Sequence, residues 1–315
     1  MSEQPTSEPA VSVAPSSAKS SAWRDFLLSL PQPVLVFSAV FAVASIQIHN
    51  WFDADLFTAL MIVLPLPLVL IAERIWTKRQ DWVLTHKEFA EDVFWLAGAV
   101  FIWYPFYTDF YQTPISEGFK AVRDTLPLGI TIEPTSVVGL VFAAIMIRTL
   151  IEFIYYWLHR VQHSSLFWWR IHATHHHITK MGAARADRGH PLEFLALFVG
   201  SPIILATMGA SDKVIAVSGA FTLFSAYLTH ANLPLKSGIY GWFFTTAEQH
   251  HLHHSYDYAS SNTNFGCVII IWDRIFGTYS DRTDVEKIGA GSGKALSILD
   301  QYKIAFVSNR KLTKY

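Results

Sequence analysis

Residues 137–163 read VVGLVFAAIMIRTLIEFIYYWLHRVQH, an apolar run that ends in two histidines four positions apart. A helix that crosses a bilayer needs about 20 mostly apolar residues, and this segment is long enough to be one. Arg148 and Glu152 are also four positions apart, so a helix presents them on one face. Because ionisable groups are costly in lipid, we expect this pair to face protein and His159 and His163 to emerge at the membrane surface.

The composition of the whole chain is typical of a membrane protein. Of its 315 residues, 51% are hydrophobic and 16% are charged, whereas soluble domains carry about 25% charged residues. The net charge of -1 gives no basic excess, which argues against a nucleic-acid partner. The single cysteine, Cys267, excludes an internal disulfide and fits a reducing compartment. Residues 1–22 are rich in Ser, Pro and Ala, so we expect a disordered tail.

Apolar runs before and after this segment, together with it, predict the fold class. Two prolines, Pro65 and Pro67, in the second run at 56–72 predict a kink. Two shorter runs, separated by GASDK, are expected to form a helical hairpin that dips into the bilayer. We therefore predict an all-α integral membrane protein with about four transmembrane helices, this hairpin, and a cytoplasmic helical cap after residue 242 that holds a histidine-rich dimetal site. The four long runs are 33–49, 56–72, 93–111 and 137–158, and the two shorter ones are 195–208 and 214–228.

The distribution of lysine and arginine predicts the orientation. Cytoplasmic loops carry an excess of these residues. The connection after the first run, NWFDAD, contains neither. We therefore expect both termini and all the histidine segments on the cytoplasmic side of a multi-pass protein, in a bacterial inner membrane. The basic residues of the loops after the second and fourth runs are Arg74, Lys78, Arg79, Lys87, Arg160, Arg170, Lys180, Arg185 and Arg188.

Ten of the 14 histidines lie in three short segments, at 159–163, 172–177 and 248–254. Their spacings are i, i+4 in the first segment and i, i+3, i+4 in the other two, which place imidazoles on one helix face. An isolated histidine in an apolar chain is usually structural, and a surface tract can bind metal weakly. Three segments with such spacing instead favour a built metal site, since neutral imidazole is a common ligand of iron, copper, nickel and zinc. The number of histidines exceeds the four ligands of a tetrahedral site, which indicates two metal ions.

The three segments also resemble the signature of a known family. HRVQH, HATHH and HHLHH match the boxes His-x3-His, His-x2-His-His and again His-x2-His-His. The stretch NFGCVIIIWDRIFGTY at 264–279 is similar to the end of the same family. Over about residues 140 to 280 the chain resembles the fatty acid hydroxylase and sterol desaturase superfamily of integral membrane di-iron oxygenases.

The resemblance implies a non-haem centre of two iron ions, O2 as co-substrate, and hydroxylation or desaturation of a lipid C–H bond. Two electrons would come from a separate donor, such as a cytochrome b5-like protein or a ferredoxin with its reductase. Zinc has no redox chemistry, which independently favours iron. The resemblance implies no catalytic residues beyond the metal ligands, and it implies as ligands His159, His163, His172, His175, His176, His230, His250, His253 and His254.

Two of the histidines outside the boxes have different expectations. His230, in THANLPL, resembles an additional family ligand, the alternative being a hydrogen-bonded histidine at a helix end. His190, in GHPLE, stands where a helix begins, so we expect it to orient a ligand, meet substrate or mark the turn without binding metal directly.

Several polar residues near the boxes are candidates for a supporting role. Metal-bound histidines usually give their second N–H to a carboxylate or carbonyl. Asp187, Glu193 and Asp257 are candidates for such a hydrogen bond or for substrate contact, and an ordinary solvated charge is the alternative for each. Asn264 is a further candidate, which with Gly266 is expected to shape a turn after the third box.

These observations divide the chain into four parts and leave some alternatives open. We expect a tail at 1–22, membrane helices at 23–135, the oxygenase core at 136–282 and a cytoplasmic tail at 283–315. A membrane metal-binding or transport protein and a zinc-dependent lipid hydrolase are the alternative functions. The lipid stays open among a sterol, a fatty acyl lipid, an amino-acid-linked lipid and an alkylglycerol. The residues do not distinguish hydroxylation, desaturation and ether oxidation.

Overall fold

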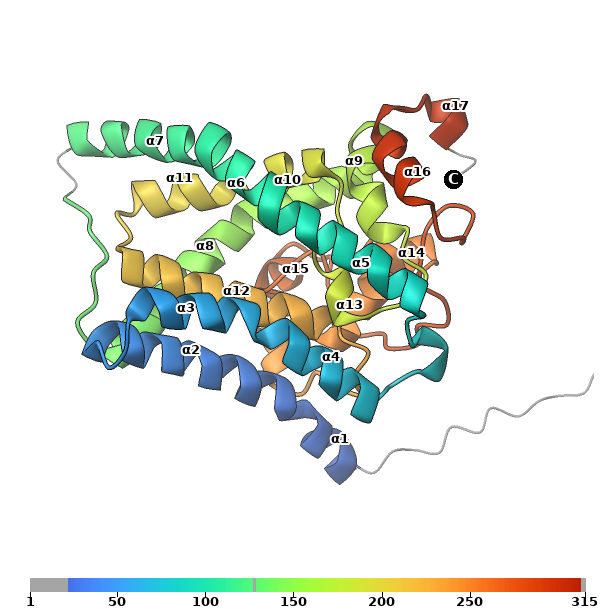
Figure 1. Cartoon of the computed structure of the whole chain (residues 1–315), viewed down its shortest axis with the longest axis horizontal. Coiled ribbons are helices and arrows are strands. Elements are labelled where there is room, and N and C mark those ends of the chain that lie inside the picture. Colours follow the sequence, from blue (N-terminus) through green and yellow to red (C-terminus); the bar gives the residue numbers. More distant parts are fainter. Residues whose placement is uncertain (1–21, 127–128, 313–315) are drawn as a thin grey trace, which may run out of the picture.

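The computed structural model describes residues 22–126 and 129–312, whose arrangement is shown in Figure 1. Within these residues the protein is built from helices and contains no β-strand, which confirms the all-α part of the predicted fold class. The predicted tail at 1–22 lies outside the described residues except for Ala22, with which helix α1 (Ala22–Ser29) begins.

The first two apolar runs form the helices α2 (Pro31–His49), α3 (Ala54–Val63) and α4 (Pro65–Ile75). The kink expected in the second run is a break, because α3 ends at Val63 and Pro65 starts the next helix. Proline has no N–H for the helical ladder and is favoured at the first helical position. The helix α2 packs against α8 (Val137–Ser164) and α12 (Asp212–His230), and these three helices supply much of the main hydrophobic core.

The third apolar run belongs to a longer helical segment than the sequence indicated. It consists of α5 (His86–Gly98), α6 (Tyr104–Tyr107) and α7 (Thr113–Thr125), joined by π-helical turns at Ala99–Trp103 and Thr108–Gln112. The expected run ended at residue 111, whereas the helical segment continues through α7 to Thr125. Single π-helical turns are often found at functional sites, and residues of this segment line the cavity described below.

The fourth run forms α8, which begins where Ser136 accepts a hydrogen bond from the N–H of Gly139. It continues six residues past the predicted end at 158 and carries His159 and His163 on its last turns. The fifth run is divided into α10 (Pro191–Leu197) and α11 (Gly200–Thr207). A Cβ atom at Gly200 would lie 3.0 Å from Cβ of Ile154, so glycine permits the close approach of α11 to α8.

Two helical stretches, 22–49 and 137–164, are long and apolar enough to cross a membrane. Large apolar side chains also point outward from the helices of this part of the molecule. An exposed apolar surface of this extent marks contact with lipid or with another protein. Together with the two long helices it indicates a membrane protein. Examples are Leu35, Phe41, Leu60, Leu68, Ile71, Phe101, Phe110 and Phe142.

The charged pair in α8 faces protein, as the sequence predicted. Arg148 and Glu152 are buried and form an ion pair within the helix. The second carboxylate oxygen of Glu152 accepts hydrogen bonds from three successive backbone N–H groups, at 3.0, 3.1 and 3.4 Å, in the segment 267–269. The pair therefore fixes the chain that follows the third histidine box against α8.

Most of the remaining helices gather at one end of the molecule, on the right in Figure 1, whereas α15 lies nearer the middle. They are α9 (Leu166–His176), α13 (Ala247–His253), α14 (Tyr258–Ser261), α15 (Ile271–Ile275), α16 (Ile298–Lys303) and α17 (Asn309–Leu312). A capping box starts α13, in which Thr246 and Gln249 satisfy each other's backbone N–H groups. This cap fixes the start of the short helix that carries the third histidine box.

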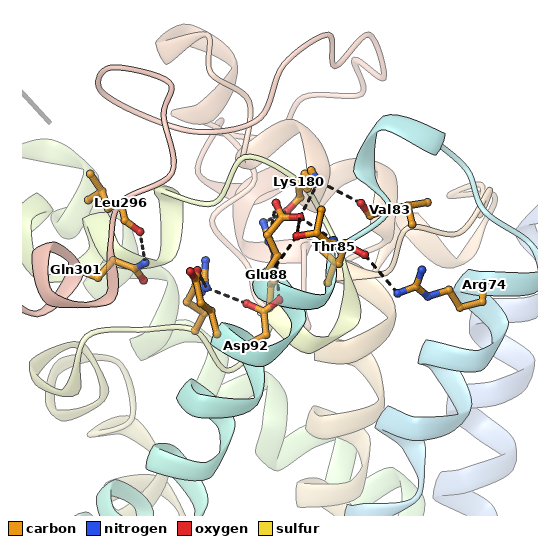
Figure 2. A network of polar contacts seen from close by, with 12 residues as sticks. Arg74, Val83, Thr85, Glu88, Asp92, Lys180, Leu296 and Gln301 are labelled. Atoms are coloured by element: carbon orange, nitrogen blue, oxygen red, sulfur yellow. Dashed lines mark hydrogen bonds and ion pairs between the residues drawn. The ribbon is translucent and has the colours of Figure 1, made fainter.

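A polar network joins the start of α5 to the loop after α9 (Figure 2). Thr85 and Glu88 form a capping box, and Lys180 donates to Glu88 at 2.7 Å. Arg185 donates to the buried carboxylate of Asp92 at 3.2 Å. Because Lys180 and Arg185 both lie in the loop 177–190, the network holds the loop that follows the second histidine box in place.

Candidate metal centre

The structure brings the nine histidines predicted as ligands into two adjacent groups. Within each group the ligand nitrogens all lie within 4.8 Å of one another. The first group contains five histidines and the second contains four, and all but His175 are fully buried. The five-histidine group is His159, His163, His172, His176 and His253, and the four-histidine group is His175, His230, His250 and His254.

Each His-x2-His-His box contributes to both groups. In α9, His172 and His176 belong to the five-histidine group, while His175 belongs to the other. In α13 the assignment is reversed, since His250 and His254 join the four-histidine group and His253 joins the five-histidine group. Residues at i and i+4 lie nearly above one another on a helix, whereas i+3 is displaced around the axis. Each box can thus supply ligands to both of two neighbouring sites, two to one site and one to the other.

Hydrogen bonds fix the tautomer of three histidines in the five-histidine group. Nδ1 of His159 lies 2.6 Å from the carbonyl oxygen of Phe265, and Nδ1 of His253 lies 2.8 Å from that of Thr263. A carbonyl oxygen only accepts, so each Nδ1 carries the proton and each Nε2 presents a lone pair. Nδ1 of His172 donates in the same way to the carboxylate of Glu193 at 2.6 Å.

In the four-histidine group, backbone carbonyls fix the same tautomer at two of the histidines. Nδ1 of His175 lies 2.9 Å from the carbonyl oxygen of Arg188. Nδ1 of His230 lies 2.9 Å from that of Ala226, one turn earlier in α12. Both histidines therefore also present Nε2 as a lone pair toward the centre of their group.

The lone pairs face one another at distances that suit a cation. Nε2 of His159 lies 2.9 Å from Nε2 of His172 and 3.1 Å from Nε2 of His253. Nε2 of His230 lies 3.4 Å from Nε2 of His175 and 3.0 Å from that of His250. Metal–nitrogen bonds of about 2.1 Å at right angles would place two nitrogens about 3.0 Å apart. Facing lone pairs repel one another without a positive charge between them, so the donor set fits one metal ion in each group.

The protonation state of the histidines also suits metal binding. Burial lowers the pKa of His175 to about 4. Burial, reinforced by the neighbouring imidazoles, lowers the pKa of five others well below the ordinary value of 6.5. Metal binding requires the neutral ring, and these rings are neutral at pH 7 before any metal arrives. The five are His172, His176, His250, His253 and His254.

A cavity of about 590 Å³ opens beside the four-histidine group. His175, His230 and His250 line one end of it, and the helices α6, α8, α10, α11 and α12 form its walls. None of the described residues that line the cavity belongs to the five-histidine group. The volume falls in the range of small-molecule sites, which is about 300 to 1,000 Å³. A ligand in this cavity therefore meets one of the two candidate metal sites.

The family model for fatty acid hydroxylase matches residues 141–278, a segment that contains all nine histidines. Over this segment the chain is similar to the fatty acid hydroxylase family, in agreement with the resemblance of its histidine boxes. An ornithine lipid hydroxylase from Rhizobium tropici is 29% identical over 245 residues, which cover 76% of this chain and 70% of the relative. No solved structure matches the chain significantly.

Other relatives match the chain over a smaller part of their length. The alkylglycerol monooxygenase of Homo sapiens is 28% identical over 157 residues, 50% of this chain and 34% of the relative. A very-long-chain aldehyde decarbonylase from Arabidopsis thaliana is 28% identical over 163 residues, 46% of this chain and 24% of the relative. The hydroxylase and monooxygenase relatives confirm the prediction that the chain is an oxygenase-class enzyme.

Among the described residues, Glu193 is the one predicted carboxylate that contacts a box histidine. It lies in the first turn of α10, is buried, and accepts from His172. Asp187 instead accepts a hydrogen bond from the hydroxyl of Tyr104 at 3.0 Å and lines the cavity. Asp257 matches the alternative expectation of a solvated charge: it is exposed and caps α14 by accepting from the N–H and hydroxyl of Ser260.

Asn264 shapes the turn after the third box, as expected. Its φ of 56° lies in the left-handed region that asparagine tolerates. Its side chain bonds to the carbonyl oxygens of Gln249 and Ser280, at 3.2 and 3.0 Å. The flanking carbonyl groups of Thr263 and Phe265 are thereby aimed at two box histidines.

His190 lies outside both groups and caps α10. Its Nδ1 accepts from the N–H of Leu192 at 3.1 Å, and its Nε2 lies 3.2 Å from the carbonyl oxygen of Tyr302. Both ring nitrogens are therefore used by backbone groups, and neither is directed at a metal site.

The groups that sequence reasoning missed are backbone carbonyls. Four of them orient box histidines or His230, and three come from loops with no composition signal. Only the carbonyl of Ala226 could have been anticipated, because it lies four residues before His230 in the same helix.

Proposed function

We propose that this protein is a membrane-bound di-iron oxygenase that uses O2 and two electrons to hydroxylate or desaturate a C–H bond of a lipid. The observation that carries the proposal is the pair of histidine groups, whose Nε2 lone pairs converge beside a mostly apolar cavity. The names of two relatives, an ornithine lipid hydroxylase and an alkylglycerol monooxygenase, favour hydroxylation of a lipid.

The nine histidines would hold two iron ions, which supply the activation of O2. Iron suits the site because the reaction requires a change of oxidation state, which zinc does not offer. For hydroxylation, one oxygen atom enters the C–H bond, and the other leaves as water with two electrons and two protons. The electrons would come from a separate donor of the cytochrome b5 or ferredoxin type.

The residues of this chain would prepare the site in three ways. Glu193 and the carbonyl groups of Thr263, Phe265, Arg188 and Ala226 hold the imidazoles in one tautomer. Mutation of a group that hydrogen-bonds to a metal ligand typically lowers metal affinity or activity about 10- to 100-fold. The walls of α10, α11 and α12 would hold a hydrocarbon chain and exclude water from the reacting carbon.

The architecture we propose places residues 136–282 as the oxygenase core, with 23–135 as supporting membrane helices and 283–315 as a cytoplasmic tail. The crossings would be α2, the pair α3 and α4, the stretch 93–111 within the segment α5 to α7, and α8, while α10 to α12 would enter the bilayer as a hairpin. The lysine and arginine asymmetry supports a cytoplasmic site in a bacterial inner membrane.

Labelling of single introduced cysteines in intact cells tests this orientation. Trp51 and Glu117 are exposed near the opposite end of the helices, and Arg282 is exposed beside the cap. We expect Trp51→Cys and Glu117→Cys to react with an impermeant maleimide, and Arg282→Cys to react only after lysis. The wild type reports the background from Cys267. The reverse pattern would place the histidines away from the reducing compartment and refute the orientation.

Metal analysis and lipid analysis together test the activity. Protein purified in detergent should contain iron near two ions per chain, as two histidine groups require. Cells that express it under air should accumulate a lipid heavier by one oxygen atom, and cells that express His176→Ala should not. Activity that persists without O2, or in protein that contains only zinc, would indicate a lipid hydrolase and refute the proposal.

A further inference from the structure

The cavity has two chemically different ends. Far from the histidines it is walled by apolar side chains, among them Leu205, Ile215 and Leu223. Near the histidines it is walled by Tyr104, Asp187 and Tyr227. With a rise of 1.5 Å per residue, Tyr227 lies one turn before His230 in α12, whereas Ile215 lies about 22 Å away along the axis. The polar residues are therefore next to the candidate metal site, and the apolar arm leads away from it.

Asp187 is the carboxylate at this polar end that pairs with no arginine, lysine or histidine among the described residues. One of its oxygens accepts a hydrogen bond from the hydroxyl of Tyr104 at 3.0 Å, and Tyr227 lines the same cavity. Its second oxygen, Oδ2, is buried and has no hydrogen-bond partner among the described residues. The described ion pairs do not include Asp187, and burial raises the pKa of its carboxyl group.

The other charged groups that line the cavity are already paired. Arg148 pairs with Glu152 inside α8, and Glu193 accepts a hydrogen bond from the neutral ring of His172. Arg188 pairs with Glu91 and Asp92 at 3.3 and 3.1 Å. The Nε atoms of both arginines have no acceptor among the described residues, so they can serve an uncharged carbonyl of a ligand. Asp187 is the carboxylate in this set that serves neither an arginine nor a box histidine, and a buried acceptor without a partner favours a ligand that brings a hydrogen-bond donor.

We propose that Asp187 is a substrate-positioning residue, which accepts a hydrogen bond from an ammonium or hydroxyl group in the headgroup of the lipid. The headgroup then lies beside His175, His230 and His250, and the hydrocarbon tail follows α12 toward Ile215. The inference rests on the proposed function and narrows it. It selects lipids with a donor-bearing headgroup, and it places the oxidised carbon near that headgroup and away from the end of the tail.

Binding of three simple amphiphiles of equal chain length tests the inference. The full-length protein in detergent, loaded with iron, is titrated with radiolabelled hexadecylamine and competed with hexadecanol and hexadecanoate. The wild type should prefer the amine and the alcohol to the carboxylate. Asp187→Asn should weaken binding of the amine about tenfold or more, since hydrogen bonds to charged groups contribute that much. Binding of hexadecanoate should be unchanged or stronger.

Two further variants keep the outcomes distinct. Asp284→Asn removes an exposed carboxylate and should leave all binding unchanged. Gly219 lines the apolar arm, and a Cβ atom there would meet no described atom within 4 Å, so Gly219→Phe fits and narrows the arm. It should weaken all three ligands. Equal binding of the amine by the wild type and Asp187→Asn, with loss in Gly219→Phe, would overturn the role of Asp187 while the lipid cavity stands.

The remaining outcomes separate this inference from the proposed function. Unchanged binding in both Asp187→Asn and Gly219→Phe would show that lipid binds elsewhere and would overturn the cavity as well. Loss of iron together with weaker binding of all three ligands in Asp187→Asn would make Asp187 a structural residue and overturn the inference. A loss confined to the amine, or confined to the alcohol, supports it and identifies the donor as ammonium or hydroxyl.

Discussion

Replacement of His230 by alanine removes one of the four imidazoles of the smaller histidine group. Its Nε2 lies 3.0 Å from that of His250 and 3.4 Å from that of His175, so both lose their nearest partner across the site. Three imidazoles remain there, while the five-histidine group is untouched. We therefore expect bound iron to fall from about two ions per chain to about one, with loss of turnover. Loss of a hydrogen-bond partner of a ligand typically lowers metal affinity or activity about 10- to 100-fold, and loss of the ligand itself should lower the affinity further.

His190→Ala is the matched control, because His190 is equally buried but lies outside both groups. It should retain its iron and lose only the cap of α10, which costs about 1 kcal/mol. That loss corresponds to a decrease of about 2–4 °C in the melting temperature of a chain of this size. His190→Asn offers the N–H of Leu192 another acceptor and should recover most of the decrease.

Iron per chain is measured by mass spectrometry on protein of confirmed monodispersity, and stability by thermal unfolding in the same detergent. Full iron retention in His230→Ala would remove His230 from the metal site. Equal iron loss in His230→Ala and His190→Ala would place His190 among the ligands. Either result would refute the assignment of His175, His230, His250 and His254 as the ligands of one metal ion.

Three further outcomes follow from individual contacts. Glu193→Gln removes the carboxylate from His172 and should weaken iron binding about 10- to 100-fold in a chelator competition, without unfolding the protein. Glu152→Gln leaves Arg148 buried without its counter-charge and should cost about 3–5 kcal/mol in thermal unfolding, which the double variant Arg148→Met, Glu152→Leu should largely recover. Burial raises the pKa of Glu88, but hydrogen bonds from Lys180 and Thr85 outweigh it and lower the pKa from 4.5 to about 2. Its contribution to stability is therefore complete above pH 4.5 and lost as the pH falls toward 2, so Glu88→Gln should flatten the acid side of the stability profile.

Much of the candidate metal site was predictable because its histidines lie in local repeats. The spacings of His159 with His163, and of the two His-x2-His-His boxes, follow from the helical period alone. The chemistry of imidazole then indicated metal, and the number of rings indicated two ions. The contact of Arg148 and Glu152 with protein also followed from the cost of ionised groups in lipid.

The tertiary structure decided what depends on contacts between segments far apart in the sequence. The division of each box between the two groups required the relative rotation of α9 and α13, which neither segment encodes alone. The carbonyl groups of Thr263 and Phe265 reach their histidines because Glu152, more than 100 residues earlier, holds the chain that follows them. Asp257 and Asp187 were equivalent in the sequence, as acids near a box. Packing left Asp257 at the surface and placed Asp187 in the cavity. Burial depends on how the helices assemble, so it cannot be predicted from the type of a single residue.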